Sequence, residues 1–316
     1  MKRFPIVLVS VAVSLTACGG TTANPSPSGA GGPAKVASIA AEVPSSVPTP
    51  LQIATDATYP PDESIDPNTG DIVGWDIDLG KAICKVMGVV CTFNNVTFDS
   101  IIPQLTASNP RYVMGISSFT PTQERENKGI DFVSYYKAGE GWIVKGSSNI
   151  TINSAADMCG HTVAVETGTT EETDAWAFIG KTVGAAAATT KDYCKDAGKQ
   201  DLKVANFEKQ TDANTALLSD RADIGFLDSQ VAAYQVKVTG GKVKTSGQGC
   251  SVAPYGIALA KGSPIEKAVT DAVKYLIDNG YYKTILQTWS VADGAIQSSD
   301  VKINDNKSIG PTCVPS

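Results

Sequence analysis

From Leu51 onward, short apolar runs that suit β-strands alternate with amphipathic stretches that suit α-helices. The expected strands lie at 51–55, 91–96, 112–116, 142–144, 162–165, 202–205, 223–226 and 255–260, and the expected helices at 79–87, 98–105, after Thr170, 213–218 and 265–279. Repeated β-then-α units imply mostly parallel sheets covered by helices. In such sheets ligands bind at the carboxyl ends of the strands, where helix N-termini point.

Composition fits a two-lobed globular body and argues against two classes of partner. About 265 of the 316 residues lie beyond residue 50, which is enough for two lobes of ordinary domain size. The net charge of −6 becomes −8 once Lys2 and Arg3 leave with the expected signal peptide. Phosphate contacts need clustered lysine and arginine, so an acidic chain without basic runs argues against nucleic acid and anionic lipid surfaces.

The N-terminus has the three parts of an export signal. Lys2 and Arg3 are basic, residues 6–13 are an apolar run too short to span a bilayer, and small residues precede Cys18. We therefore expect a signal peptide at residues 1–17. Cys18 follows Leu-Thr-Ala, which resembles a bacterial lipobox and implies acyl chains on Cys18 as the membrane anchor. The alternative is an ordinary secretory signal with an incidental cysteine.

Residues 18–50 are expected to be a disordered tether between the lipid and the body. They are rich in Gly, Ser, Thr, Ala and Pro and contain almost no large apolar side chain. Such a segment buries too little surface to offset its ordering entropy. The body would then stand at the extracytoplasmic face of the cell membrane.

Six cysteines remain once Cys18 is assigned to lipid, and an even set in an exported protein suggests disulfides. Six cysteines permit fifteen pairings. We predict that nearest neighbours pair: Cys84–Cys91, Cys159–Cys194 and Cys250–Cys313. The last pair would tie the C-terminal tail, 296–316, to the body. No CxxC pair and only one histidine are present, so we expect no metal site of the usual zinc type.

A single arginine follows a cluster of hydroxyl side chains in the stretch 115–132. Arg125 carries a flat fork of donors that matches a carboxylate and stays charged. The hydroxyls beside it belong to Ser117, Ser118 and Thr120. Far downstream, Asp228 is a lone carboxylate after another apolar run. A donor fork and a remote acceptor suit the two charged ends of an α-amino acid, although Arg125 could instead pair with an acidic neighbour on a solvated turn.

Several motifs occur in a set order along the body. They are Ala54-Thr-Asp-Ala-Thr-Tyr-Pro-Pro, Val73-Gly-Trp-Asp-Ile-Asp-Leu, Phe98-Asp-Ser-Ile-Ile-Pro-Gln-Leu, the stretch around Arg125, Val163-Ala-Val-Glu-Thr-Gly-Thr-Thr, Arg221-Ala-Asp to Asp228, Tyr255-Gly-Ile-Ala and Asn279-Gly-Tyr-Tyr. In this order they resemble the polar-amino-acid solute-binding proteins of bacterial ABC importers (solute-binding family 3) over about residues 51–292. Cys84 and Cys91 also lie where relatives that bind histidine, lysine and arginine carry a short-loop disulfide.

The resemblance implies a two-lobed, periplasmic-binding-protein-like (type II) α/β fold with mostly parallel sheets and two hinge crossings. Lobe one would be 51–137 plus 249–295, and lobe two 138–248. The chain would act as a monomer that closes over an amino acid and delivers it to ABC permease subunits, without a cofactor.

Binding roles carried over from the family fall on residues of both lobes. Arg125 would grip the α-carboxylate with help from Thr120 and from Thr170, whose backbone N–H begins a helix. Ser118 and Asp228 would hold the α-ammonium. Thr169 and Thr170 would equally suit a plain helix N-cap with Glu172 nearby.

The ligand side chain would be lined by Asp56, Tyr59, Phe98 and Glu166. The faces of Tyr59 and Phe98 favour a cation or a flat stem. Glu166 departs from relatives, which carry apolar or basic residues there. Because an Asp56–Glu166 pair in a closed cleft favours guanidinium or ammonium, we expect an arginine- or lysine-type ligand. If Glu166 instead faces solvent, glutamine or another neutral polar amino acid stays open.

A second class of function is open on the same fold, which also hosts exported cyclohexadienyl dehydratases. Such an enzyme needs a buried acid or base near neutrality, and Asp56 or Glu166 would be the candidates. The Arg125 and Asp228 pair suits an intact amino acid better, so we expect no catalytic residues. No Walker A, HExxH or GxSxG motif is present.

Overall fold

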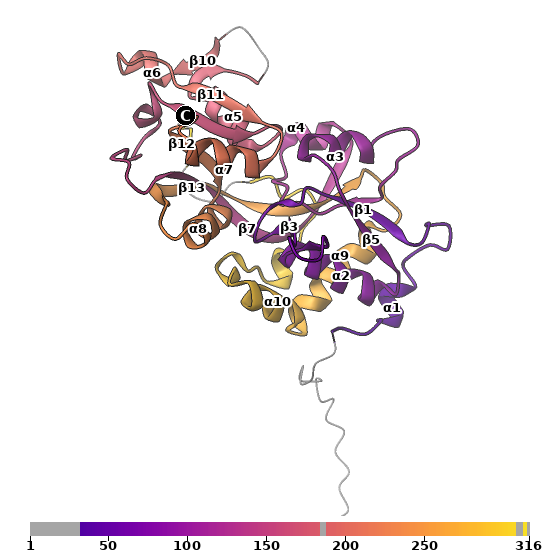
Figure 1. Cartoon of the computed structure of the whole chain (residues 1–316). Helices are drawn as coiled ribbons and strands as arrows, with labels where there is room; N and C mark the ends of the chain where they lie inside the picture. Colours follow the sequence, from indigo (N-terminus) through magenta and orange to yellow (C-terminus); the bar gives the residue numbers. More distant parts are fainter. Residues whose placement is uncertain (1–31, 184–187, 308–311, 315–316) are drawn as a thin grey trace, which may run out of the picture.

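The computed structural model describes residues 32–183, 188–307 and 312–314. It has two lobes that meet along a shared sheet (Figure 1). This eight-stranded sheet has the order β11-β8-β12-β7-β13-β6-β1-β5. The predicted fold class is confirmed, because in this sheet the strands pair in parallel within each lobe and the antiparallel pairs lie at the junction.

Lobe one has a parallel core of β1 (Leu51–Thr55), β5 (Cys91–Asn95) and β6 (Met114–Gly115). Its helices are α2 (Trp75–Met87), α3 (Phe98–Leu105), α4 (Gln123–Asn127), α9 (Glu266–Asp278) and α10 (Tyr281–Trp289). Helix α9 buries Ala268, Val269, Ala272, Val273 and Leu276, whose spacing of three and four residues makes one apolar face. These elements confirm the strand and helix pattern expected for lobe one.

Lobe two repeats the arrangement with β8 (Thr162–Glu166), β11 (Lys203–Phe207) and β12 (Ile224–Asp228). Its helices are η1 (Ala155–Met158), α5 (Thr170–Ala177), α6 (Tyr193–Asp196), α7 (Gln210–Leu218) and α8 (Ser229–Val238), and its small hairpin is β9 (Ile179–Lys181) with β10 (Ala188–Asp192). Figure 1 shows most of these elements, including α5, α6, α7 and β10–β12, on one side of the junction and away from α2, α9 and α10, whereas α8 lies close to α10.

Two long antiparallel strands cross between the lobes: β7 (Ile130–Lys145) and β13 (Val243–Ala260). Their register shifts three times between Ser246 and Gly256, and such bulges bend and twist a strand. The cores change over the same region, since Ala138 packs in the first core whereas Cys250 packs in the second. The predicted limits assign Ala138 to lobe two and Cys250 to lobe one, the reverse of where these residues pack. Each strand continues in the core of the lobe where it begins until it reaches the bulged region.

The prediction of a disordered tether through residue 50 is wrong for residues 32–50. This segment includes α1 (Ala37–Ala40), and its residue Ile39 is buried in the core of lobe one. Val36, Val43 and Val47 pack partly against the same core. The four aliphatic residues follow one another at three- and four-residue spacing, so together they bury a stripe that the Gly-, Ser- and Pro-rich composition hides. The expected signal peptide, Cys18 and residues 19–31 lie outside the described residues.

The C-terminal tail joins both lobes. It follows η2 (Ala292–Gly294) and includes η3 (Ser298–Asp300), and Ile296 and Val301 are buried in the core of lobe one. Asn304 then forms two hydrogen bonds with Phe132 of β7: its backbone N–H donates to Phe132 O at 2.9 Å, and its side-chain Oδ1 accepts from Phe132 N at 2.8 Å. Further on, Cys313 lies in the core of lobe two, bonded to Cys250.

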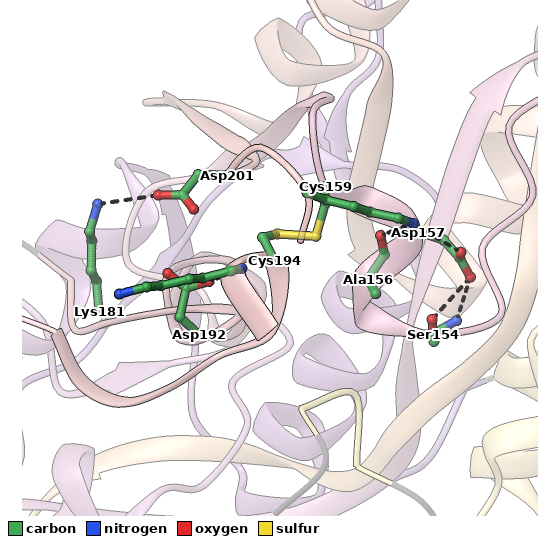
Figure 2. The surroundings of a disulfide bond; sticks show 10 residues. Ser154, Ala156, Asp157, Cys159, Lys181, Asp192, Cys194 and Asp201 are labelled. Atoms are coloured by element: carbon green, nitrogen blue, oxygen red, sulfur yellow. Dashed lines mark hydrogen bonds and ion pairs between the residues drawn. A yellow bond between two sulfur atoms is a disulfide. The ribbon is translucent and has the colours of Figure 1, made fainter. Parts of the chain in front are cut away.

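All three predicted disulfides are present: Cys84–Cys91, Cys159–Cys194 and Cys250–Cys313. Figure 2 shows Cys159 and Cys194 between the capping box of η1 and the Lys181–Asp201 pair. Asp157 and Ser154 form that capping box, which fixes the loop carrying Cys159. Within the described ranges, no helix has the length and apolar character needed to cross a bilayer.

A small sheet of β2 (Thr58–Tyr59), β3 (Glu63–Ile65) and β4 (Ile72–Val73) covers a group of buried carboxyls. We call Asp62, Glu63 and Asp76 the carboxyl triad; each is 0% exposed. Asp62 accepts from Trp75 Nε1 at 2.6 Å, and Asp76 accepts from Tyr135 OH at 2.8 Å. Among the described residues, Glu63 Oε2 and Asp76 Oδ1 have no hydrogen-bond partner.

Burial raises the pKa of every member of the carboxyl triad, and for Asp62 the value is about 6. In Glu63 and Asp76 the neighbouring carboxylates raise the pKa further. A carboxyl whose pKa is higher in the folded chain than in the unfolded chain favours folding while it is protonated. Its contribution is therefore complete below about pH 4 and is lost as the pH rises through the folded pKa.

We expect Asp62→Asn to flatten the dependence of stability on pH. The wild-type free energy of unfolding should lose up to about 3 kcal/mol from this group between pH 4 and pH 7, because its pKa shift spans about two units. Urea denaturation across this range measures the slope, with the exposed Asp71→Asn as the control. An equal slope in Asp62→Asn and in the wild type would show that Asp62 stays ionised.

We also expect the disulfide of the tail to contribute more stability than the short-loop disulfide. Cys250 and Cys313 are 63 residues apart, whereas Cys84 and Cys91 are 7 apart. The chain-entropy model then gives about 4 kcal/mol for the first pair and about 2 kcal/mol for the second. Urea denaturation of the two Cys→Ser double variants tests this order, and a larger loss in the Cys84/Cys91 variant would contradict it.

Candidate ligand-binding site

The carboxyl ends of strands from both lobes meet at one cavity. From lobe one come the loops after β1 and β6, and from lobe two the loops after β8 and β12. The residues lining the cavity are Tyr59, Phe98, Ser117, Ser118, Thr120, Arg125, Thr169, Thr170, Glu171 and Asp228. Eight of the ten predicted site residues are therefore together. The other two, Asp56 and Glu166, are buried next to the cavity beside Tyr59 and Phe98.

Arg125 is buried, and it reaches from lobe one to lobe two. Its Nη1 donates to Thr120 O at 2.7 Å, and its Nη2 donates to Gly168 O at 2.9 Å. The guanidinium also lies over the ring of Phe98, 5.3 Å from its centroid. Helix α4 holds the residue in place, because Thr122 Oγ1 accepts from Arg125 N as the N-cap. The interpretation of Arg125 as a solvated turn residue is wrong.

Gly168 lets the two lobes approach at this point. Its φ of +84° lies in the left-handed region, which suits glycine. A Cβ built on it would lie 2.9 Å from the Cβ of Asp99 in lobe one. A side chain at residue 168 would therefore push the lobes apart and withdraw the carbonyl that Arg125 binds.

The start of α5 provides the lobe-two wall beside Arg125. Thr169 caps the helix, since its Oγ1 accepts from Glu172 N at 3.1 Å, as the capping alternative predicts. Thr170 Oγ1 donates to Glu171 Oε2 at 3.3 Å. Glu171 lines the cavity and is 4% exposed. Sequence reasoning missed Glu171, although its place directly after Thr170 in the first turn of α5 was a usable signal.

Asp228 ends β12 and is buried on the other side of the cavity. Burial raises the pKa of Asp228 well above its usual value, and the nearby Glu171 and Asp62 carboxylates raise it further. Arg125 and a hydrogen bond from Tyr255 act in the opposite direction. A positive group in the cavity would stabilise the ionised form of Asp228.

The hydroxyl groups of Ser117 and Ser118 point into lobe one. Ser117 Oγ donates to Glu63 at 2.6 Å, and Ser118 Oγ donates to Asp62 at 2.8 Å. The hydroxyl protons of both serines are thus donated to the carboxyl triad. The hydroxyl and backbone carbonyl oxygens of the serines are left as hydrogen-bond acceptors for a ligand. Ser118 has a φ of 51°, a conformation that costs a non-glycine residue energy and clusters at ligand sites.

Asp56 and Glu166 form a carboxyl pair at the far end of the site, one from each lobe. Asp56 Oδ2 accepts from Phe98 N at 2.8 Å. Glu166 is 1% exposed, and neither of its carboxyl oxygens has a hydrogen-bond partner among the described residues. Burial, followed by the charge of Asp56, raises the pKa of Glu166 to about 10. The alternative that Glu166 faces solvent is therefore wrong.

The aromatic wall consists of Tyr59, Phe98 and Phe119. Phe98 stacks on Phe119 with a distance of 4.5 Å between the ring centroids. The ring planes of Tyr59 and Phe98 make an angle of 39°, and their centroids are 6.3 Å apart. Tyr59 belongs to lobe one, yet it packs in a cluster with Leu227 and Val231 of lobe two. Tyr59 and Phe98 thus form adjacent walls, and Tyr59 also packs against lobe two.

Contacts across the cleft hold the lobes together around the site. Gln230 Nε2 of α8 donates to Asp62 Oδ2 at 2.8 Å, and Gln210 N of α7 donates to Thr58 Oγ1 at 3.3 Å. The cavity has a volume of about 10 Å³, which suits about one water molecule. A larger ligand must therefore enter while the lobes stand further apart. Sequence reasoning missed Asp62 and Gln230, because a hydrogen bond over 168 residues leaves no local pattern.

Comparison with known proteins agrees with this geometry. The arginine-binding protein ArgT of Corynebacterium glutamicum is 29% identical over 249 residues, which cover 79% of this chain and 77% of that protein. A solved ancestral arginine-binding protein with arginine bound is 35% identical, with a TM-score of 0.65 over 76% of this chain and 97% of its own.

A third similar protein is a solved ancestral amino acid-binding protein, a precursor of cyclohexadienyl dehydratase. It is 32% identical, with a TM-score of 0.63 over 76% of this chain and 94% of its own. The family model for bacterial extracellular solute-binding proteins, family 3, matches residues 51–292. The two lobes, the cavity between them and this match lead to one conclusion: the chain belongs to family 3 of the bacterial extracellular solute-binding proteins.

Proposed function

We propose that the chain is the extracytoplasmic substrate-binding lipoprotein of an ABC importer and captures a cationic amino acid of the arginine or lysine type. Its relatives include an arginine-binding protein of Corynebacterium glutamicum and an ancestral protein solved with arginine. Family membership supports the extracytoplasmic location and the partnership with a permease. The lipid on Cys18 rests on the sequence alone.

The Asp56–Glu166 pair carries the choice of ligand. A buried carboxyl group without a partner costs free energy unless a proton or a cation neutralises it. Glu166 is such a group, and Asp56 stands beside it from the other lobe. A guanidinium or ammonium group between them would supply the missing donors and charge. A glutamate side chain would add a third negative charge and cost several kcal/mol.

The common head of the amino acid would bind at the opposite end. Arg125 would turn its guanidinium from the carbonyls of Thr120 and Gly168 to the α-carboxylate, a stronger acceptor. Asp228 and the acceptor oxygens of Ser118 would take the α-ammonium. Because Arg125 belongs to lobe one and Asp228 to lobe two, binding of one zwitterion would favour closure.

Further carboxylates support a cationic ligand. A second cavity of about 340 Å³ shares Thr120, Thr170 and Asp228 with the first, and Glu140 and Asp174 also line it. Burial and neighbouring carboxylates raise the pKa of Glu140 well above its usual value, and burial raises that of Asp174 to about 6. A positively charged amino acid entering this cavity would stabilise the ionised forms of both carboxyls.

Two other functions are possible for this site, and direct measurement distinguishes them from the cationic amino acid receptor. A receptor for glutamine or another neutral polar amino acid would use the same head site, with a protonated Glu166 as hydrogen-bond donor. An enzyme related to cyclohexadienyl dehydratase is suggested by the ancestral precursor, and the raised pKa of the Glu166 carboxyl would suit an acid catalyst. Turnover of a cyclic aromatic precursor by the purified protein would favour the enzyme over the receptor.

We expect Arg125→Ala to abolish binding of every ligand and Glu166→Gln to change the preference among ligands. Loss of a buried charged hydrogen-bond partner typically costs 2–5 kcal/mol, so Arg125→Ala should weaken binding at least 30-fold. Glu166→Gln should weaken arginine binding about tenfold or more and leave glutamine binding equal or tighter. Calorimetric titration of arginine, lysine and glutamine measures both effects.

Two exposed variants provide matched controls for these changes. Arg111→Ala removes an exposed arginine of lobe one, and Glu208→Gln removes an exposed carboxylate of lobe two. Both should bind like the wild type. Tight binding of glutamine together with no heat from arginine or lysine would refute the cationic ligand. Equal losses for arginine and glutamine in Glu166→Gln would remove Glu166 from the choice of ligand.

A further inference from the structure

Glu171 is a carboxylate in the binding cavity that an α-amino acid does not need. It is the second residue of α5, it is 96% buried, and it lines the cavity with Arg125 and Asp228. Its Oε1 atom has no hydrogen-bond partner within the described part of the chain. The side chain is therefore neither a surface residue nor a satisfied core residue.

Glu171 contacts the groups proposed to bind the α-carboxylate. The hydroxyl of Thr170 donates to Glu171 Oε2 at 3.3 Å. Glu171 is also the neighbour that most favours the charged form of Arg125, although burial lowers the pKa of the guanidinium. Thr170 and Arg125 thus already face a carboxylate that belongs to the protein, at the head end of the site.

When Glu171 and Asp228 are both ionised, the charges in the cavity balance for an amine rather than for a zwitterion. Among the described residues that line the cavity, Arg125 is the one cation, and Glu171 and Asp228 are the two carboxylates. An α-amino acid head brings one positive and one negative charge, so one carboxylate stays uncompensated. An ammonium group without a carboxylate would leave the head end neutral.

We propose that the site also takes dicationic amines that lack an α-carboxylate, such as decarboxylated arginine (agmatine), with Glu171 in place of the ligand carboxylate. The ammonium group binds Asp228, and the guanidinium group binds Asp56 and Glu166. Glu171 remains beside Arg125 and Thr170. This inference rests on the proposed function, because it uses the same Asp56–Glu166 carboxyl pair to hold the cationic end of the ligand.

Calorimetric titration of the secreted protein with agmatine and with arginine tests the inference. We expect agmatine to bind within about tenfold of arginine and to compete with it. Glu171→Gln should weaken agmatine and strengthen arginine, so that the ratio of the two dissociation constants changes at least tenfold. Glu124→Gln is the matched control, because Glu124 is next to Arg125 in α4 but has a 70% exposed side chain.

The outcomes separate this inference from the proposed function. If arginine binds and millimolar agmatine does not, the inference is overturned and the proposed function stands. If both bind but Glu171→Gln leaves their ratio unchanged, Glu171 does not act as the built-in carboxylate and the inference is overturned. If neither binds, both fail. If the thermal melt shows that Glu171→Gln does not fold, the wild-type protein alone tests the inference. Agmatine affinity within about tenfold of arginine affinity supports it, and no binding of millimolar agmatine overturns it.

Discussion

A carboxylate that leaves water needs a proton, a cation or several donors to replace its hydration. The cleft between the two lobes holds Asp56, Glu166, Glu171 and Asp228 in buried positions, and among the described residues that line the cavity Arg125 is the cation beside Glu171 and Asp228. Burial raises the pKa of all four carboxyls, and neighbouring carboxylates raise it further in Glu166, Glu171 and Asp228. A positively charged ligand removes the same cost in one step, so the acidity of the cleft links ligand choice to closure.

The fold makes this arrangement possible because each carboxylate ends a strand or begins a helix. Asp56 follows β1, Glu166 ends β8 and Asp228 ends β12. The sequence pattern indicated Asp228, since an apolar run ending in a polar residue shows where a strand stops, whereas Asp56 and Glu166 were predicted from the family resemblance. The disulfide pairs and α9 were equally accessible, because cysteine order and three-four spacing are local signals.

Other features depended on contacts that the sequence does not display. Residues 58–73 form a three-stranded sheet, but they are rich in turn-forming residues, which are typical of a loop. The long crossing strands β7 and β13 show no alternation of apolar and polar residues, because most of their residues are buried on both faces of the sheet. The segment 32–50 was assigned to a tether because its average composition masked four aliphatic residues. The Gln230–Asp62 bond joins lobes that only the tertiary structure brings together.

Closure and recognition are coupled through residues that serve both lobes. Tyr59 packs among side chains of lobe two, Arg125 donates to Gly168 of lobe two, and Asp62 accepts from Gln230. Asp62 also holds the hydroxyl of Ser118, so the carboxyl triad lies directly behind the head end of the site. A ligand that draws Arg125 toward itself breaks the Gly168 contact and must replace it with a bridge of its own. A cationic amino acid can do so because its α-carboxylate meets Arg125 while its positive ends meet carboxylates of both lobes. A dication leaves Arg125 beside Glu171 and bridges the lobes through its positive ends alone, whereas a neutral side chain leaves Asp56 and Glu166 without a cation.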